Sequence, residues 1–365
     1  MIDPYLRTLL VIITIIAATI AVMLLAMIWI RFITSINNHK YKQKEQEWQD
    51  IYLNYLLGDI DLEKAAGLIK GENRYYWLWT FFAPYLEVLT GNDFEKTKAL
   101  CREIGLIDHY RKILFYSSTA GKAIAAKALG TMHCWQSVPE MKKLLQSDNQ
   151  LLIQSAVYGL ARSGEKSSFI PAVKALLNST YFTYEGIIEM LTIYGERICP
   201  DALSFLKNPT MQQATGNDKI NLSVYRSLMI NLLGYFKYRE ALPFLKEMLK
   251  DADDETSVHI FKAFLNMKSV PPNLDLKPYL EHPYWVVRNF SAQAWKLTGD
   301  RETLPILEKL LSDKHWWVRF HAAEALRSAG EPGLKILNRK TADPDQKAAA
   351  ISIYALNRNE VQMQI

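Results

Sequence analysis

A sequence pattern that recurs every 31 residues restricts the fold of this 365-residue chain more than any other feature. The segments 284–295 and 315–326 match in order: aromatic residues come first, a Val-Arg pair follows, and a run of small residues ends the segment. The same register occurs earlier, where 124–129 corresponds to 155–160. Self-similarity at a fixed period of this length is typical of repeat proteins.

Glycines follow the apolar stretches at a related interval, and they are Gly130, Gly164, Gly195, Gly234, Gly299 and Gly330. A glycine is favoured just past the last turn of a helix, because that position often takes a left-handed conformation. Several glycines are followed by a proline, which suits the first turn of a new helix; these prolines are Pro171, Pro200, Pro243 and Pro305. Each unit is therefore predicted to be a helix, a glycine turn, a second helix that starts near a proline, and a polar turn.

One such hairpin buries its apolar side only by stacking on neighbouring hairpins. We therefore predict an all-α fold, an α-solenoid of about eight helical hairpins over residues 119–365, preceded by one N-terminal transmembrane helix. Residues 37–118 are expected to form a helical stalk and an N-terminal cap region. Residues 1–36 are expected to form a short exterior N-terminus and the membrane anchor. The polar stretch 209–221 is interpreted as an insertion between two units.

The anchor is the segment Thr8–Ile30, which contains no charged residue, no proline and no glycine. As a helix it would be roughly 34 Å long, which is enough to cross the hydrocarbon core of a bilayer. The alternative is a cleaved signal peptide, whose apolar region is usually shorter and ends in a small-residue cleavage site. The segment instead runs into Trp29 and Arg31, so an uncleaved anchor is preferred.

The flanking charges predict the orientation of this anchor. Arg7 precedes the segment, whereas Arg31, Lys40, Lys42 and Lys44 follow it closely. The positive-inside rule then places the C-terminal part in the cytoplasm, as in a single-pass protein of the cell (inner) membrane. Three cysteines without short-range pairing agree with a reducing compartment; they are Cys101, Cys134 and Cys199.

The region after the anchor leaves two questions open. The membrane helix can continue into 41–57 as a stalk, or it can break near 35–38, where Ser and Asn are poor interior residues. An aromatic patch follows, with candidate residues Tyr75, Tyr76, Trp77 and Trp79. It is either a surface that binds a partner or the membrane, or the hydrophobic cap of the first repeat.

The repeat motifs resemble a known family. Val-Arg, small-Ala-x-Ala-Leu, Gly-Asp/Glu and x-Pro-x-Leu are similar to the short HEAT-like repeats of the PBS-lyase type. The segments 316–326 and 330–334 resemble bacterial membrane-anchored HEAT-repeat domain proteins, in which one N-terminal helix precedes the array. Members are often met beside membrane glycosyltransferases. The resemblance therefore implies a role in polysaccharide synthesis or export.

No motif that carries chemistry stands out in the sequence. None of the seven histidines forms a zinc-type i, i+4 pair, and the acidic run 251–255 lacks the central glycine of a calcium loop. We therefore assign no catalytic, cofactor-binding or metal-binding residue and no small-molecule substrate, and we expect no enzyme. One alternative is an enzyme or enzyme accessory of the HEAT-like chromophore-lyase kind. A nucleic-acid-binding repeat is a further alternative, which the scattered charges and the formal net charge of +5 disfavour.

The expected function is that of a membrane-tethered scaffold whose helical array binds a membrane-associated protein partner, with residues 8–30 in the membrane. Candidate partner-binding residues recur at equivalent repeat positions: Trp285, Trp316, Trp317, Arg288 and Arg319. The tryptophans serve either as inter-repeat packing or as binding hot spots. The arginines either form a basic row or pair with acidic groups of adjacent units, and Asp313 is the candidate partner of Arg319.

Overall fold

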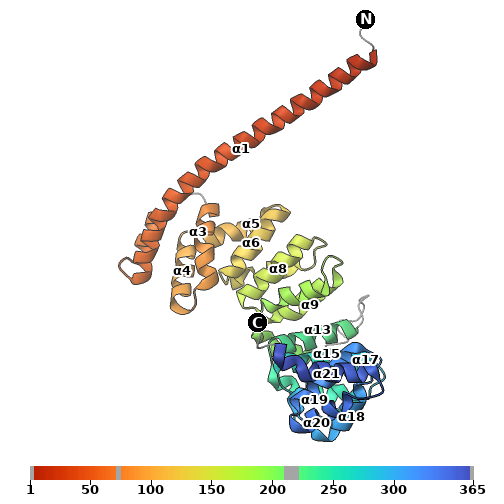
Figure 1. Cartoon of the computed structure of the whole chain (residues 1–365). Helices are drawn as coiled ribbons and strands as arrows, with labels where there is room; N and C mark the ends of the chain where they lie inside the picture. Colours follow the sequence, from red (N-terminus) through yellow and green to blue (C-terminus); the bar gives the residue numbers. More distant parts are fainter. Residues whose placement is uncertain (1–3, 71–74, 209–221, 362–365) are drawn as a thin grey trace. The chain divides into compact units, whose positions relative to one another are not determined.

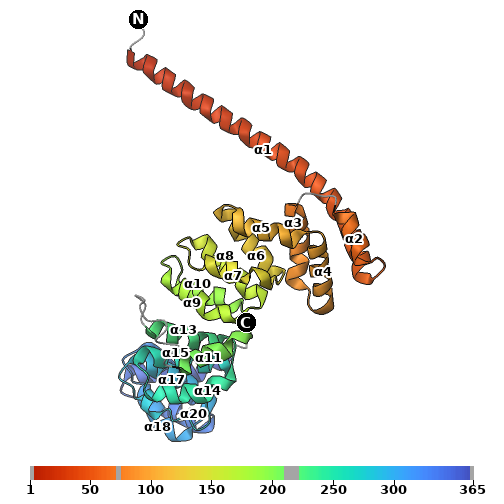
Figure 2. The same ribbon diagram turned by 180° about the vertical axis from the view of Figure 1, so that it is seen from behind.

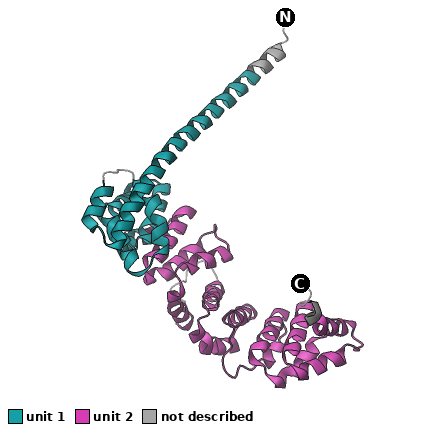
Figure 3. Cartoon of the chain, turned by 60° about the vertical axis from the view of Figure 1, so that its left-hand side comes forward, with its two compact units in different colours: residues 1–140 teal, residues 141–365 magenta. Residues whose placement is uncertain are grey.

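The computed structural model describes residues 4–70, 75–208 and 222–361, with side chains from residue 12 to residue 357 within these ranges. Throughout this part of the chain the regular elements are helices, joined by turns, and no strand occurs (Figure 1). The predicted all-α class is therefore confirmed. The chain divides into two compact units, Met1–Glu140 and Met141–Ile365 (Figure 3). The predicted insertion at 209–221 lies outside the described residues.

The first helix, α1 (Pro4–Leu57), is 54 residues long and runs without a break through 35–38. Its continuity follows from a sequence without proline or glycine between Tyr5 and Leu57. The side chains from 12 to 36 are exposed, although most are apolar. Among the described helices, α1 alone is long and apolar enough to cross a membrane by length and composition, and an 18-residue window within it has a mean hydropathy of 2.6.

The C-terminal half of α1 belongs to the core of the first unit. Trp48 and Tyr52 are 1% and 0% exposed, and their rings meet Phe81 and Phe82 of α3 (Tyr75–Val88). Such edge-to-face pairs add to the gain from burying large aromatic rings. The other elements of this unit are α2 (Leu62–Ile69), α4 (Gly91–Glu103), α5 (Leu106–Tyr116), α6 (Thr119–Thr131) and η1 (Trp135–Ser137). The division between the units falls within α7 (Val138–Leu144).

The second unit is a row of helical hairpins. The first helices of the hairpins are α8 (Gln150–Ser163), α10 (Tyr184–Thr192), α13 (Leu222–Tyr235), α15 (Asp254–Met267), α17 (Trp285–Thr298), α19 (Trp316–Ser328) and α21 (Gln346–Val361). The second helices are α9 (Phe169–Asn178), α11 (Cys199–Lys207), α14 (Leu242–Lys250), α16 (Lys277–Leu280), α18 (Leu304–Leu310) and α20 (Glu331–Lys340). Each of these first helices packs on the next one, from α8 through to α21. Sequence neighbours are thus spatial neighbours, as a repeat array requires.

A short 3₁₀ turn starts most second helices, and a proline follows it. The turns are η2 (Lys166–Ser168), η3 (Glu196–Ile198), η4 (Arg239–Ala241) and η5 (Arg301–Thr303). Pro200, Pro243 and Pro305 lie in the first two positions of the helices that follow, where no intrahelical hydrogen bond is lost. The sequence rule for the start of the second helix is confirmed at these three prolines.

The glycine rule holds at four of the six positions. Gly164, Gly195, Gly299 and Gly330 all have positive φ at the end of a first helix. For Gly130 and Gly234 the prediction was wrong, because both lie inside helices, α6 and α13.

The left-handed position after these two helices is taken by a residue with a side chain, His133 (φ 48°) after α6 and Lys237 (φ 55°) after α13. Gly234 instead allows close packing: a Cβ there would lie 2.8 Å from the Cα of Ala263 in α15.

Candidate partner-binding surface

The predicted tryptophans start α17 and α19, because the loop before each helix ends at an equivalent repeat position. Trp285 is the first residue of α17, and Trp316 and Trp317 are the first two residues of α19. Trp285 is partly buried, and its ring stacks on His315 of the next unit with centroids 4.6 Å apart and planes 10° apart. This tryptophan therefore joins two adjacent repeats.

Trp316 and Trp317 lie on the outside of the array, 47% and 52% exposed. Trp316 stacks on Phe320 one turn further along α19, with centroids 5.1 Å apart. Phe320 in turn meets Tyr354 of α21 at 5.9 Å, and Tyr354 is 49% exposed. We call Trp316, Trp317, Phe320 and Tyr354 the aromatic surface. Clustered, half-exposed aromatic rings are typical of protein-binding sites.

The two repeated arginines fold back onto the loops that precede their own helices. Arg288 Nη1 donates to the carbonyl oxygens of His282 (2.6 Å) and Pro283 (2.9 Å). Arg319 Nη1 donates in the same way to those of Asp313 (2.8 Å) and Lys314 (3.2 Å). Each arginine thereby satisfies carbonyl groups in a turn between helices.

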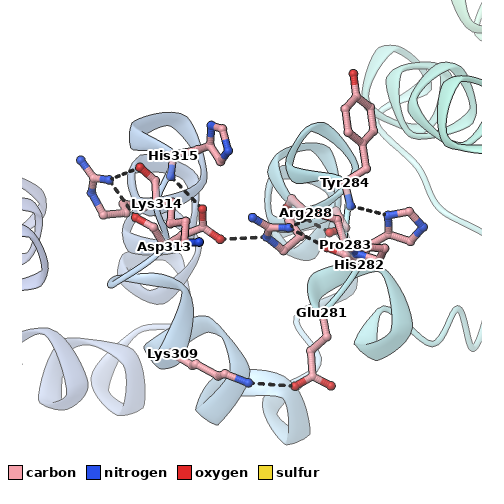
Figure 4. Close-up of polar contacts among 11 residues, drawn as sticks. Glu281, His282, Pro283, Tyr284, Arg288, Lys309, Asp313, Lys314 and His315 are labelled. Carbon is pink, nitrogen blue, oxygen red and sulfur yellow. Dashed lines mark hydrogen bonds and ion pairs between the residues drawn. The ribbon is translucent and has the colours of Figure 1, made fainter.

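Asp313 links two neighbouring hairpins of the second unit (Figure 4). Its Oδ2 accepts a hydrogen bond at 2.8 Å from Nε of Arg288, which belongs to the preceding hairpin. Only 7% of the Asp313 side chain and 15% of the Arg288 side chain are exposed. Its Oδ1 accepts from the backbone N–H of His315 at 2.8 Å. The expected pairing of the Asp313 carboxylate with Arg319 was therefore wrong, because Arg319 contacts the Asp313 backbone carbonyl oxygen.

Ion pairs also run between the second helices. Lys309 of α18 lies 3.6 Å from Glu281, which directly follows α16 (Figure 4), and Glu308 of α18 lies 2.6 Å from Arg339 of α20. Most of these side chains are exposed, so each pair is weak. Both pairs join neighbouring hairpins, so opposite charges face each other at these two places.

A histidine beside the aromatic surface is uncharged. His321 stacks on Trp317 with centroids 6.1 Å apart. Burial and the nearby Lys296 lower the pKa of His321 to about 4, although Glu324 acts in the opposite direction. The imidazole is therefore uncharged at neutral pH.

The four residues of the predicted aromatic patch have different environments. Tyr75 stacks on His109, Trp77 meets Tyr41, and Trp79 meets Tyr110; all three are partly buried within the first unit. Tyr76 alone is largely exposed, at 69%. The structure thus brings Tyr75, Trp77 and Trp79 into ring contacts with α1 and α5 and leaves Tyr76 at the surface.

No group of three or more His, Cys, Asp or Glu side chains within the described residues is placed to hold a metal ion. Burial raises the pKa of the Cys101 thiol and raises that of Cys199 to about 12, which makes both poor nucleophiles. An open groove of about 680 Å³ lies between α7 and α9, lined by Lys142, Lys174 and Tyr181 among others.

Sequence reasoning missed Phe320 and Tyr354. Phe320 lies four residues after Trp316, so helical spacing alone could have added it to the candidate residues. Tyr354 has no aromatic equivalent one period earlier, because Ala323 stands there. The repeat pattern therefore carried no signal for it.

A match to a family model agrees with this architecture. Residues 273–357 match the family model for HEAT repeats. No curated protein sequence matches the chain. A crystal structure of an engineered protein is similar at 14% sequence identity, over 81% of this chain and 88% of that one, with a TM-score of 0.32.

The chain is thus a helical-repeat protein by its own geometry. Its units over 273–357, which include the aromatic residues of α19 and α21, match HEAT repeats.

Proposed function

We propose that this chain is a membrane-tethered, non-catalytic scaffold that binds a protein partner through its HEAT-like array. The observation that carries the proposal is the aromatic surface, where Trp316, Trp317 and Tyr354 are each about half exposed on two adjacent helices. Monomeric proteins rarely leave such clusters open to water. Tryptophan and tyrosine are also the residues most often found as hot spots of protein interfaces.

The tether in this proposal is the apolar part of α1, residues 8–30. The described side chains of this segment are exposed, although most are apolar, and exposed apolar side chains on an isolated helix favour a lipid environment. The flanking charges favour a cytoplasmic array in a single-pass topology at the inner membrane. A tether of this kind raises the effective concentration of the array near membrane-bound partners.

The proposed partner is a membrane-associated protein, and a membrane glycosyltransferase is the first class to test. This choice rests on the resemblance to membrane-anchored HEAT-repeat proteins met beside such enzymes. A large apolar contact centred on the tryptophans of α19 would suit a stable complex, because buried aromatic anchors dominate binding energy.

The proposal is tested by purifying the full chain from native membranes in mild detergent and identifying the membrane proteins that remain bound. We expect a specific partner whose recovery falls about tenfold or more in Trp316→Ala/Trp317→Ala, since truncating a hot spot costs more than 1 kcal/mol per residue. Tyr235→Ala is the matched control, because Tyr235 is 56% exposed on α13 of the same array.

Recovery that depends equally on Tyr235 and on the two tryptophans would contradict the role of the aromatic surface. Recovery of no membrane protein by the wild-type chain would contradict the scaffold itself. Circular dichroism of each variant checks that the array stays folded.

A further inference from the structure

The first turn of α3 lies at the end of the first unit nearest the apolar segment. The ring contacts between α1 and α3 advance along both helices together, in the order Tyr41–Trp77, Trp48–Phe81 and Tyr52–Tyr85. The two helices therefore run in the same direction. Tyr41 comes eleven residues after Ile30, which corresponds to about 16 Å along a helix.

The same end of α3 contacts α5. Tyr75, the first residue of α3, stacks on His109 of α5 with centroids 4.1 Å apart, and Trp79 meets Tyr110 at 5.7 Å. From these contacts α5 extends to the turn that leads into α6. Figures 1 and 2 show this turn on the side of α3 toward which the N-terminal half of α1 extends.

The α5–α6 turn carries apolar side chains that the first unit does not bury. Phe115 and Tyr116 end α5 and are 48% and 90% exposed, with ring centroids 6.1 Å apart. Ala120 and Ile124 are also exposed and lie one turn apart on the same side of α6. Aromatic rings beside a short apolar strip are typical of segments that enter the headgroup layer of a membrane.

The sequence around this turn is basic, and of its cations Arg111 lies 3.8 Å from Asp108. Between Asp108 and Glu140 the sequence has no acidic residue, and its cations there are Arg111, Lys112, Lys122 and Lys127. The segment that leads out of the apolar part of α1 has the same character, because no acidic residue occurs between Asp3 and Glu45. Cations on the parts that lie toward the apolar segment favour anionic lipid headgroups.

We propose that the α5–α6 turn, residues 115–124, is a second membrane contact. In this arrangement Phe115 and Tyr116 enter the headgroup layer of the leaflet from which α1 emerges, and the cations of α5 and α6 bind its anionic phospholipids. The inference rests on the proposed insertion of residues 8–30. Its consequence is that the first unit lies against the bilayer at two places.

The test uses the full chain in lipid nanodiscs that contain anionic phospholipid, with a fluorophore on one engineered cysteine. The three native cysteines are buried, so they do not compete for the label under native conditions. The labelled variants are Thr119→Cys in the turn, Ile20→Cys in the apolar segment, and Leu57→Cys at the far end of α1. Quenching by lipids that carry a spin label in the headgroup or in the acyl chain reports the depth of each site.

We expect the headgroup quencher to act on the label at 119, the acyl-chain quencher on the label at 20, and neither on the label at 57. Phe115→Ser/Tyr116→Ser in the Thr119→Cys background should abolish the quenching at 119. Both replaced side chains are exposed, so the fold should persist, which circular dichroism checks. Replacing the anionic lipid by a zwitterionic one should weaken quenching at 119 and leave it unchanged at 20.

Quenching at 20 without quenching at 119 would overturn the second contact and leave the anchor intact. Absence of quenching at 20 would overturn the anchor, and the second contact with it. Equal quenching at 119 in anionic and zwitterionic discs would overturn the proposed role of the cations.

Discussion

Gly234 shows how a single missing side chain sets the spacing of two repeats. The 2.8 Å distance from its hypothetical Cβ to the Cα of Ala263 involves backbone, which a rotamer change cannot relieve. Close helix contact at this position therefore requires glycine on α13. The same residue was expected from sequence to end a helix, because a glycine near the end of an apolar run gives one signal for two different roles.

At this scale we predict that Gly234→Ala destabilises α13 and α15. Alanine is the better helix former, by about 1 kcal/mol, but forcing the two helices apart should cost about 1–3 kcal/mol. Hydrogen exchange of α13 and α15 should show a net loss of protection. Gly67→Ala in α2 is the control, since nothing lies within 4 Å of a Cβ there. Unchanged protection in Gly234→Ala would show that separating the helices costs no more than the roughly 1 kcal/mol that alanine gains as a helix former; increased protection would show that it costs nothing.

At the scale of elements, the repeated turns join neighbouring hairpins through specific polar contacts. Arg288 binds two carbonyl oxygens of its own turn and the carboxylate of Asp313 in the next one. The pair is largely buried, so removing one partner leaves the other poorly satisfied. Contacts of this kind fix the position of one hairpin against the next.

A double-mutant cycle measures this link. We expect Arg288→Met and Asp313→Asn each to weaken hydrogen-exchange protection of α17 and α19, with a coupling energy of about 1–3 kcal/mol between them. The exposed pair Lys335–Glu331 is the matched control, and its coupling should stay below about 0.5 kcal/mol. Additive effects of Arg288→Met and Asp313→Asn would show that the pair does not connect the hairpins.

Much of the arrangement of the helices could be predicted from the sequence. The all-α class, the hairpin period and the starts of the second helices all followed from glycine, proline and apolar spacing. The partner of Asp313 did not follow, because two equivalent arginines lie within reach and only the loop geometry selects Arg288. The continuity of α1 also remained open in the sequence, since Ser35 and Asn38 are poor but tolerated helix residues.

At the scale of the whole molecule, the second unit is stabilised by contacts between neighbours, so damage should stay local. Trp295 of α17 is 1% exposed, and its Nε1–H donates to Asp300 O (2.9 Å) and Thr303 Oγ1 (2.8 Å). Removing this ring would leave a cavity in the core of one hairpin. It would also remove the donor that Asp300 O and Thr303 Oγ1 share.

We therefore expect Trp295→Ala to cost about 3–5 kcal/mol locally. Hydrogen exchange resolved by mass spectrometry should show reduced protection in α15, α17 and α19, with protection unchanged in α8, α9 and the helices of the first unit. A uniform loss of protection across both units would contradict the nearest-neighbour picture and indicate a single cooperative fold.

Because α1 runs without a break through 35–38, the rotation of its C-terminal end about the helix axis is fixed relative to its apolar segment. Its last turns are part of the core of the first unit, so that unit must rotate with the helix as one piece. One residue added between Arg31 and Lys40 would turn the whole unit by about 100° about the helix axis, whereas seven added residues would return it to within about 20° of its starting direction. The number of residues between the apolar segment and Tyr41 thus determines the direction, around the helix axis, in which the unit points relative to the faces of the apolar segment.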